Sequence, residues 1–265
     1  MYSTYRLALK YVQYLLHAGN GKGHGIHSPF VYEFVTEVLQ DQRQFYAYPA
    51  IEGLRERMLS NYKEVDTGQF GAGSAAAKAS KRRIADIAKT AAKRRKYGQL
   101  LYRIVDHYQP NTILELGTSL GLSSAYLAAG NLGAGVFTLE GSSDLAAQAR
   151  QNFDALGLQN IEVINGDFDQ ELPKLLSRLP SLDLAFIDGN HRKAPTLKYF
   201  DLLCQQLSPS AVLIFDDVHW SREMEEAWLH IQADPRTMLS VDLFFLGIVF
   251  FNTDFKQKQH FVIRF

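Results

Sequence analysis

Short apolar runs alternate with longer amphipathic segments along the chain from about residue 111 to about residue 232. The runs occupy residues 112–117, 135–140, 161–166, 182–189 and 211–217, and they are rich in Val, Ile, Leu and Phe. Such runs are typical of parallel strands that are covered on both faces. The segments between them have helical spacing of apolar residues and predict helices. This alternation predicts an α/β fold with a parallel sheet and right-handed crossovers.

The end of the chain breaks this alternation. Two strand-like runs, 239–252 and 259–265, are separated only by the polar loop TDFKQK. Because no helix fits between them, we expect them to pair as an antiparallel hairpin that closes the sheet. The predicted fold is therefore a Rossmann-like sheet of seven strands, with helices on both faces.

The first 110 residues have a different pattern, which predicts helices joined by irregular connections. The predicted helices span residues 3–18, 29–40, 50–62 and 96–108. Residues 66–83 are small, polar and glycine-containing, so a surface loop is expected there. Residues 78–96 contain nine Lys or Arg residues and one acid, Asp86. We therefore predict a helical N-terminal extension over 1–95, with a basic glycine-containing loop region, and a Rossmann-like domain over 96–265.

Composition narrows the class of protein. The formal net charge is zero, so overall charge does not indicate a nucleic-acid partner. Cys204 is the only cysteine, which rules out an internal disulfide framework and suits a cytoplasmic protein. Charged residues interrupt the apolar pattern at the N-terminus, which predicts an amphipathic helix rather than a secretory leader. We expect no association with a membrane.

The turn after the first predicted strand contains two glycines, Gly117 and Gly121. A dinucleotide-binding turn needs a further glycine where this chain has Thr118, and a phosphate loop needs a Gly-Lys-Ser/Thr sequence that is absent. The amides of such a turn, at the start of a helix, can hold a carboxylate. Ser119 and Ser123 add hydroxyl donors.

The next two strand ends carry groups that suit an adenosine. Glu140 ends the second strand, nineteen residues after Gly121, where a carboxylate can accept both hydroxyls of a ribose. Asp167 follows the third strand and can accept a hydrogen bond from an adenine amino group, while Phe168 covers the ring. A ligand with a carboxylate, a ribose and an adenine, but no phosphate, is S-adenosylmethionine.

The motifs ELGTSLGLSSAYLA and FIDGNH, in this order, resemble those of class I S-adenosylmethionine-dependent methyltransferases. More narrowly, they are similar to the catechol and caffeoyl-CoA O-methyltransferases and their bacterial relatives. The resemblance covers residues from about 95 to 265. It implies that Glu115 and Gly117 line the methionine end of the cofactor and that Ser123 meets the cofactor carboxylate. It also implies that Asp188 lies beneath the methionine part.

The same resemblance implies a site for a divalent cation such as magnesium. In metal-dependent relatives, the acid that matches Asp188 binds the ion together with an Asp-Asn pair, which here is Asp216-Asp217. Three oxygen ligands suit a hard cation, although the second aspartate adds a negative charge. His191 stands where the catechol enzymes have a lysine base. A histidine there can take the proton of a phenolic acceptor.

Several functions stay open at this point. The expected activity is O-methylation of a small phenolic or catechol-like acceptor by in-line transfer. The alternatives are an RNA methyltransferase that uses the basic segment 78–96, a non-catalytic cofactor-binding module and, least favoured, a dehydrogenase. Asp216-Asp217 can instead cap a helix, and His219 and Trp220 can line the acceptor pocket or simply pack. His24 and His27 share a loop without further ligands. The helical extension suits a homodimer.

Overall fold

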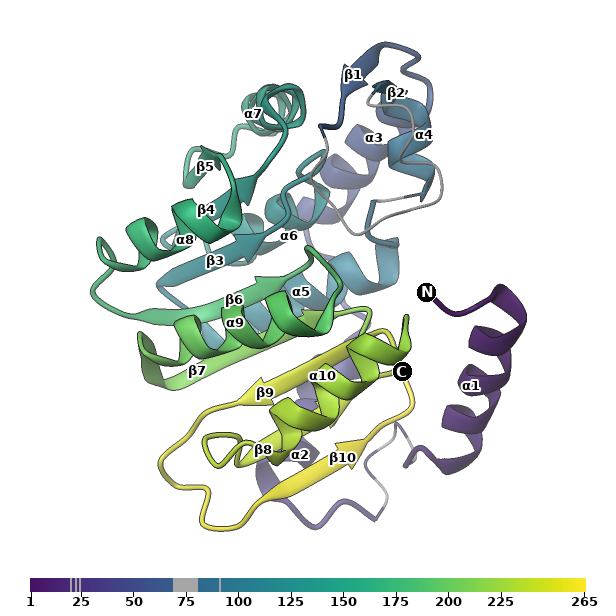
Figure 1. Ribbon diagram of the computed structural model, residues 1–265, viewed down its shortest axis with the longest axis vertical. Coiled ribbons are helices and arrows are strands. Elements are labelled where there is room, and N and C mark those ends of the chain that lie inside the picture. The colour runs from purple at the N-terminus through teal and green to yellow at the C-terminus, as the bar shows by residue number, and fades with distance from the viewer. Residues whose placement is uncertain (20, 22, 24, 69–80, 91) are drawn as a thin grey trace. The chain divides into compact units, whose positions relative to one another are not determined.

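Figure 1 shows the computed structural model of the protein, which describes residues 1–19, 21, 23, 25–68, 81–90 and 92–265. His24, Lys78 and most of the predicted loop 66–83 lie outside the described residues. The chain forms two compact units. The central unit is Gln42–Leu179, and the terminal unit combines Met1–Asp41 with Pro180–Phe265.

The central unit contains three parallel strands in the order β3-β4-β5. Leu116, at the end of β3, pairs with Leu139, and Glu140, at the end of β4, pairs with Asn165. The three carboxyl ends therefore lie side by side at one edge. The elements of the unit are α3 (Ala47–Leu59), β1 (Glu64–Asp66), β2 (Lys81–Arg83), α4 (Ile84–Thr90), α5 (Arg95–Tyr108), β3 (Thr112–Leu116), α6 (Leu122–Gly130), β4 (Gly135–Glu140), α7 (Ser143–Leu156), β5 (Ile161–Asn165) and α8 (Phe168–Leu176).

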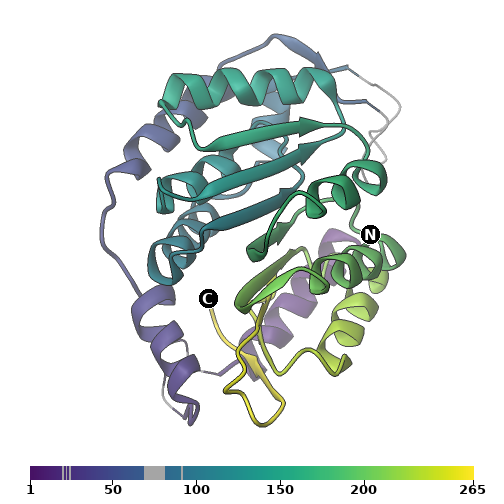
Figure 2. The same ribbon diagram turned by 90° about the vertical axis from the view of Figure 1, so that its left-hand side faces the viewer.

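Helices cover both sides of these strands, with α5 and α6 on one side and α8 on the other (Figure 2). Local signals set the helix ends. The Ser142 hydroxyl accepts a hydrogen bond from the Leu145 amide and caps α7. Gly157 ends α7 with φ of 69°.

In its described residues, the terminal unit contains five strands. β6 and β7 are parallel, β7 and β8 each pair antiparallel with β9, and β10 pairs parallel with β8. The elements of the unit are α1 (Thr4–His17), α2 (Pro29–Glu33), the π-helical turn η1 (Phe34–Leu39), β6 (Leu182–Ile187), α9 (Lys193–Cys204), β7 (Leu207–Asp216), α10 (Arg222–Ala233), β8 (Leu239–Asp242), β9 (Leu246–Phe250) and β10 (Gln259–Val262).

The closing antiparallel pair is confirmed, but its strands differ from the predicted ones. The run 239–252 does not form one strand, because the chain reverses between Asp242 and Leu246. Phe244 has φ of 69° in this turn, and its amide donates to Asp242 Oδ1 at 2.8 Å. The hairpin is therefore β8–β9, while 259–265 supplies the parallel strand β10. Apolar runs alone do not reveal a turn made by apolar residues.

Helices pack on both faces of β9. Gly247 faces α10, because a Cβ atom there would lie 2.8 Å from the Trp228 ring. Phe250, three residues on, stacks edge-to-face on Phe34 of η1 with ring centroids 5.1 Å apart. Residues separated by an odd number along a strand point to opposite faces. The terminal unit thus has α10 on one face and η1 on the other.

The α/β, Rossmann-like fold class is confirmed. The predicted helices of the first 110 residues are present within a few residues of their expected bounds, whereas the short strands β1 and β2 and helix α4 were not predicted. The boundary between an extension at 1–95 and a domain at 96–265 stays a prediction. No helix in the described ranges combines the length and apolarity that crossing a bilayer requires.

Replacing Gly247 with alanine should lower the free energy of unfolding by about 1–3 kcal/mol, because the new methyl group overlaps the Trp228 ring. Gly53→Ala is the matched control: its Cβ would lie 3.8 Å from Arg57, and alanine is the better helix former. Urea unfolding should show opposite signs for the two variants. Equal effects would contradict the packing described for β9.

Candidate functional site

The glycine turn lies at the carboxyl edge of the central strands, immediately after β3. Gly117 and Gly121 have φ of 105° and 81°, in the region that glycine adopts most readily. The amides of Gly117 and Thr118 both donate to the carbonyl of Leu139, which ties the turn to β4. Helix α6 begins at Leu122, so Ser119 lies within the turn.

The Glu140 carboxylate is bound to this turn. Its Oε2 accepts the Ser119 amide at 2.8 Å, and its Oε1 accepts the Ser142 amide at 2.9 Å. Burial raises the pKa of Glu140, while these backbone hydrogen bonds act in the opposite direction. Each carboxylate oxygen has a second lone pair, so both can still accept from a ligand hydroxyl. The Ser119 amide, in contrast, already has its acceptor.

Glu115 is fully buried in β3, beneath the turn. Its Oε2 accepts the Thr138 hydroxyl at 2.7 Å and also the Ser124 hydroxyl. Within the described residues, its Oε1 has no hydrogen-bond partner. Burial raises the pKa of Glu115 to about 7, although the surrounding hydroxyls lower it. A buried carboxylate oxygen that lacks a donor fits a ligand that brings a cationic or N–H group.

Residues of α7 also hold the turn in place. Asn152 of α7 donates to the Leu120 carbonyl at 2.9 Å. A Cβ atom at Gly121 would lie 2.5 Å from the Phe153 ring, so this glycine is also required for packing against α7. Asn152 and Phe153 could not be predicted as part of the site, because no local pattern links them to the turn. Thr138 could have been found, since a glutamate inside a covered strand needs donors on its neighbour.

The remaining predicted cofactor residues of the central unit lie near the same edge. Ser123 is in the first turn of α6 and is buried. Asp167 caps α8 by accepting the Asp169 amide at 2.8 Å, and Phe168 is the first residue of that helix. Both therefore directly follow β5, as predicted. Their roles toward adenine stay predictions.

Strand β1 also reaches the tip of β4. The Ser142 hydroxyl donates to the Asp66 carbonyl, and the Asp66 amide donates to Asp144 Oδ2 at 2.9 Å. The end of β1 is thus hydrogen-bonded to residues that closely follow Glu140. Nothing in the sequence pattern indicated this contact.

In the terminal unit, Asp188, His191 and Asp216 offer ligand atoms that all lie within 4.8 Å of one another. Asp188 and Asp216 lie at the carboxyl ends of β6 and β7, and His191 Nε2 lies 3.5 Å from Asp188 Oδ1. His191 has φ of 33°. The structure thus brings together three predicted site residues. Asp217 is not a member of this group, and its predicted role as a ligand stays a prediction.

The loop after β7, Asp217–Trp220, is held at several points. Asp217 has φ of 54°, and its amide donates to the Phe245 carbonyl at 2.7 Å. His219 lies between two carboxylates: Nε2 is 2.8 Å from Asp242 and Nδ1 is 3.2 Å from Glu225. Burial lowers the pKa of His219, but the two acids outweigh it and raise the pKa above its ordinary value. The two carboxylates therefore fix the orientation of the His219 ring.

Part of the basic segment 78–96 is engaged locally. Arg82 donates to the Thr90 hydroxyl at 2.7 Å, and Arg83 pairs with Asp86 at 2.8 Å. Burial lowers the pKa of Lys96. The role of this segment in an RNA contact stays a prediction.

Comparisons with known proteins agree with this fold and turn. A family described as "Methyltransferase domain" matches residues 114–218. Catechol O-methyltransferase from Sus scrofa is 35% identical over 130 residues, which cover 47% of this chain and 69% of that protein. The enzyme from Bos taurus is 33% identical over 129 residues, and there the match covers 46% of this chain and 47% of the bovine protein. The chain thus spans about half the length of that relative.

A solved structure of an O-methyltransferase from Bacillus cereus in complex with SAH has the same fold, with a TM-score of 0.55 and 22% identity. The match covers 83% of this chain and 97% of that one. The fold and the glycine turn define a class I S-adenosylmethionine-dependent methyltransferase. Within that class, the chain belongs to the O-methyltransferase family that includes the catechol O-methyltransferases.

Ionisation of Glu115 should destabilise the folded chain as pH rises. A pKa of about 7 in the folded state exceeds the ordinary value of 4.5, so the carboxyl is ionised in the unfolded chain first. The protonated carboxyl contributes its full stabilisation of the folded state below about pH 4.5. This contribution is lost as pH rises to about 7. Relative to Glu115→Gln, wild type should lose on the order of 1–3 kcal/mol over this range in urea unfolding. Parallel pH curves for the two proteins would refute the assignment.

Proposed function

We propose that this protein transfers the methyl group of S-adenosylmethionine to a hydroxyl oxygen of a small phenolic or catechol-like acceptor. The observation that carries the proposal is the Glu140 carboxylate, which is fixed beside the glycine turn by the Ser119 and Ser142 amides. This arrangement suits a ribose whose two hydroxyls donate to one carboxylate.

The donor set of the central unit also fits the other end of this cofactor. The buried Glu115 Oε1 lacks a hydrogen-bond partner in the described structure, and the cofactor brings an ammonium group and a sulfonium ion. Gly117 has φ of 105° and no side chain, which suits a turn whose backbone a ligand must approach closely. We assign the methionine end to Glu115, Gly117 and Ser123, and the adenine to Asp167 and Phe168.

The reaction is an in-line displacement at the methyl carbon. A lone pair of the acceptor oxygen forms the new C–O bond while the C–S bond breaks, and its electrons leave with the sulfur as a neutral thioether. The chain's main task is to align oxygen, methyl and sulfur. A phenol has a pKa of about 10, so its proton must be removed near neutral pH. We assign that proton to His191 Nε2, beside Asp188.

The same residues also fit a divalent cation. Two carboxylates and an imidazole, with ligand atoms within 4.8 Å of one another, form a mixed oxygen and nitrogen donor set. Such a set suits manganese or zinc as well as magnesium. When bound, a cation at Asp188, His191 and Asp216 would lower the pKa of a coordinated hydroxyl group. The two roles exclude each other at one ring nitrogen, because a nitrogen bonded to a metal cannot take a proton.

Glu140→Ala should weaken binding of S-adenosylmethionine by about 10–100-fold, because both ribose hydroxyls lose a charged acceptor. Isothermal titration calorimetry measures the affinity directly. Glu162→Ala, on the neighbouring strand β5, is the matched control, since its carboxylate is exposed and pairs with Arg178. If the two variants bind the cofactor equally well, the proposed ribose site is wrong.

Replacing His191 with alanine should reduce turnover of a catechol or phenol by about 10²–10⁴-fold and leave cofactor affinity nearly unchanged. Titration with Mn²⁺, followed by electron paramagnetic resonance, separates the two roles of this residue. Loss of Mn²⁺ affinity identifies a ligand, whereas retained affinity with lost turnover identifies the base. A variant that turns over like wild type would refute both roles.

A further inference from the structure

The N-terminal segment contacts both the loop Asp217–Trp220 and helix α10. The backbone amide of Tyr2 donates to the Trp220 carbonyl at 3.0 Å, and the Tyr2 hydroxyl donates to Glu225 Oε2 at 2.6 Å. One residue near the start of the chain thus joins the end of this loop to helix α10.

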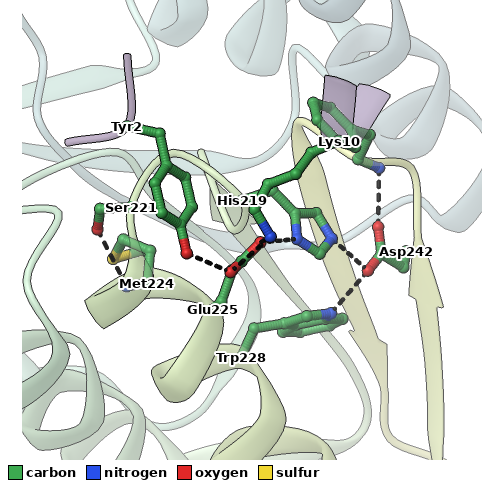
Figure 3. Close-up of polar contacts among 9 residues, drawn as sticks. Tyr2, Lys10, His219, Ser221, Met224, Glu225, Trp228 and Asp242 are labelled. Atoms are coloured by element: carbon green, nitrogen blue, oxygen red, sulfur yellow. Dashed lines mark hydrogen bonds and ion pairs between the residues drawn. The ribbon is translucent and has the colours of Figure 1, made fainter. Parts of the chain in front are cut away.

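Glu225 is where these contacts meet (Figure 3). Besides the Tyr2 hydroxyl, its carboxylate receives Lys10 Nζ, 2.8 Å from Oε1, and His219 Nδ1, 3.2 Å from Oε1. Residues 2 and 10 come from the N-terminal segment, and His219 comes from the loop. A single carboxylate therefore links α1 to the loop that follows β7.

The other side of His219 is fixed by the β8–β9 turn. Asp242 Oδ2 lies 2.8 Å from His219 Nε2 and accepts Trp228 Nε1 at 3.0 Å. The imidazole also stacks on Phe244 with ring centroids 5.1 Å apart. Glu225 and Asp242 thus both contact His219, and Lys10 pairs with Glu225. Loss of Lys10 would leave a partly buried excess of negative charge.

Helix α1 has further contacts besides these polar ones. Its inner face packs through Tyr11 and Tyr14 on Phe244, with ring centroids 5.0 and 5.3 Å apart. Tyr14 also donates its hydroxyl to the Ile263 carbonyl. The contacts of Tyr11 and Tyr14 therefore remain available to hold α1 when Tyr2 and Lys10 are replaced. Their contacts are directed at Glu225 and Trp220.

The loop begins directly after Asp216, one of the three residues whose ligand atoms gather at the strand ends. Ligands of α/β sheets bind outside the carboxyl ends of the strands, so this loop borders the acceptor side of the site. We propose that Tyr2 and Lys10 are positioning residues, which act through Glu225 and Trp220 to hold the loop Asp217–Trp220 against the acceptor. This inference rests on the proposed methyl transfer for its functional part.

The test compares the double variant Tyr2→Phe/Lys10→Met with a matched control, Tyr5→Phe/Lys89→Met. Tyr5 is 75% exposed, and Lys89 is an exposed residue of the central unit. Both double variants should fold, as checked by circular dichroism and thermal melting. Tyr2→Phe/Lys10→Arg serves as partial rescue, because arginine keeps the ion pair with Glu225.

Two measurements report on the loop without any turnover. Hydrogen exchange at the amides of Asp217 and Trp220 should accelerate about tenfold in Tyr2→Phe/Lys10→Met, as expected for loss of a hydrogen bond to a charged group. Acrylamide quenching of tryptophan fluorescence should rise as well. Trp228 is 2% exposed, so the half-buried Trp220 supplies the quenchable signal. The control variant should match wild type, and the arginine variant should lie between.

The functional part of the proposal is tested by comparing the effect on the acceptor KM with the effect on cofactor affinity. The KM for a catechol acceptor should rise about three- to tenfold, while the affinity for S-adenosylmethionine stays at the wild-type value. Wild-type exchange and quenching in Tyr2→Phe/Lys10→Met would overturn the proposal, and so would an unchanged KM in an active enzyme. If wild type methylates no catechol or phenol, the proposed function fails, and the exchange data alone decide whether Tyr2 and Lys10 hold the loop.

Discussion

The position of the Glu140 carboxylate at the tip of β4 is the constraint on which the rest of the site depends. Parallel pairing places the ends of β3, β4 and β5 at one edge, and Gly117 and Thr118 tie the turn to β4 through the Leu139 carbonyl. Only with this register can the Ser119 amide reach Glu140. The carboxylate is thus oriented before any ligand arrives, which lowers the cost of ordering on binding.

Glu115 and Glu140 illustrate two uses of buried charge in one small region. Glu140 has backbone donors on both oxygens, whereas Glu115 has hydroxyl donors on one oxygen and no partner on the other in the described structure. An incompletely satisfied buried carboxyl costs stability, and its raised pKa records that cost. A cationic ligand would supply the missing interaction. A buried polar group that is satisfied only when a ligand binds is typical of binding sites.

The sequence predicts the strands, most helices and the site edge, because each depends on local patterns. Period and composition identify β3 to β7, and the turn glycines mark where a ligand can approach. The β8–β9 turn was missed because its residues, Leu243 to Phe245, are all apolar. The contacts of Tyr2 and Lys10 with Glu225 join residues more than 200 positions apart, and no local pattern encodes them. The grouping of His191 with Asp188 and Asp216 likewise needs coordinates.

The most direct test of the account is a crystal structure of this protein with S-adenosylhomocysteine bound. We predict that both ribose hydroxyls lie within hydrogen-bond distance of the Glu140 carboxylate and that the amino group lies next to Glu115 Oε1. An adenosyl group bound elsewhere, or a Glu140 side chain turned away from the ribose, would contradict the central claim.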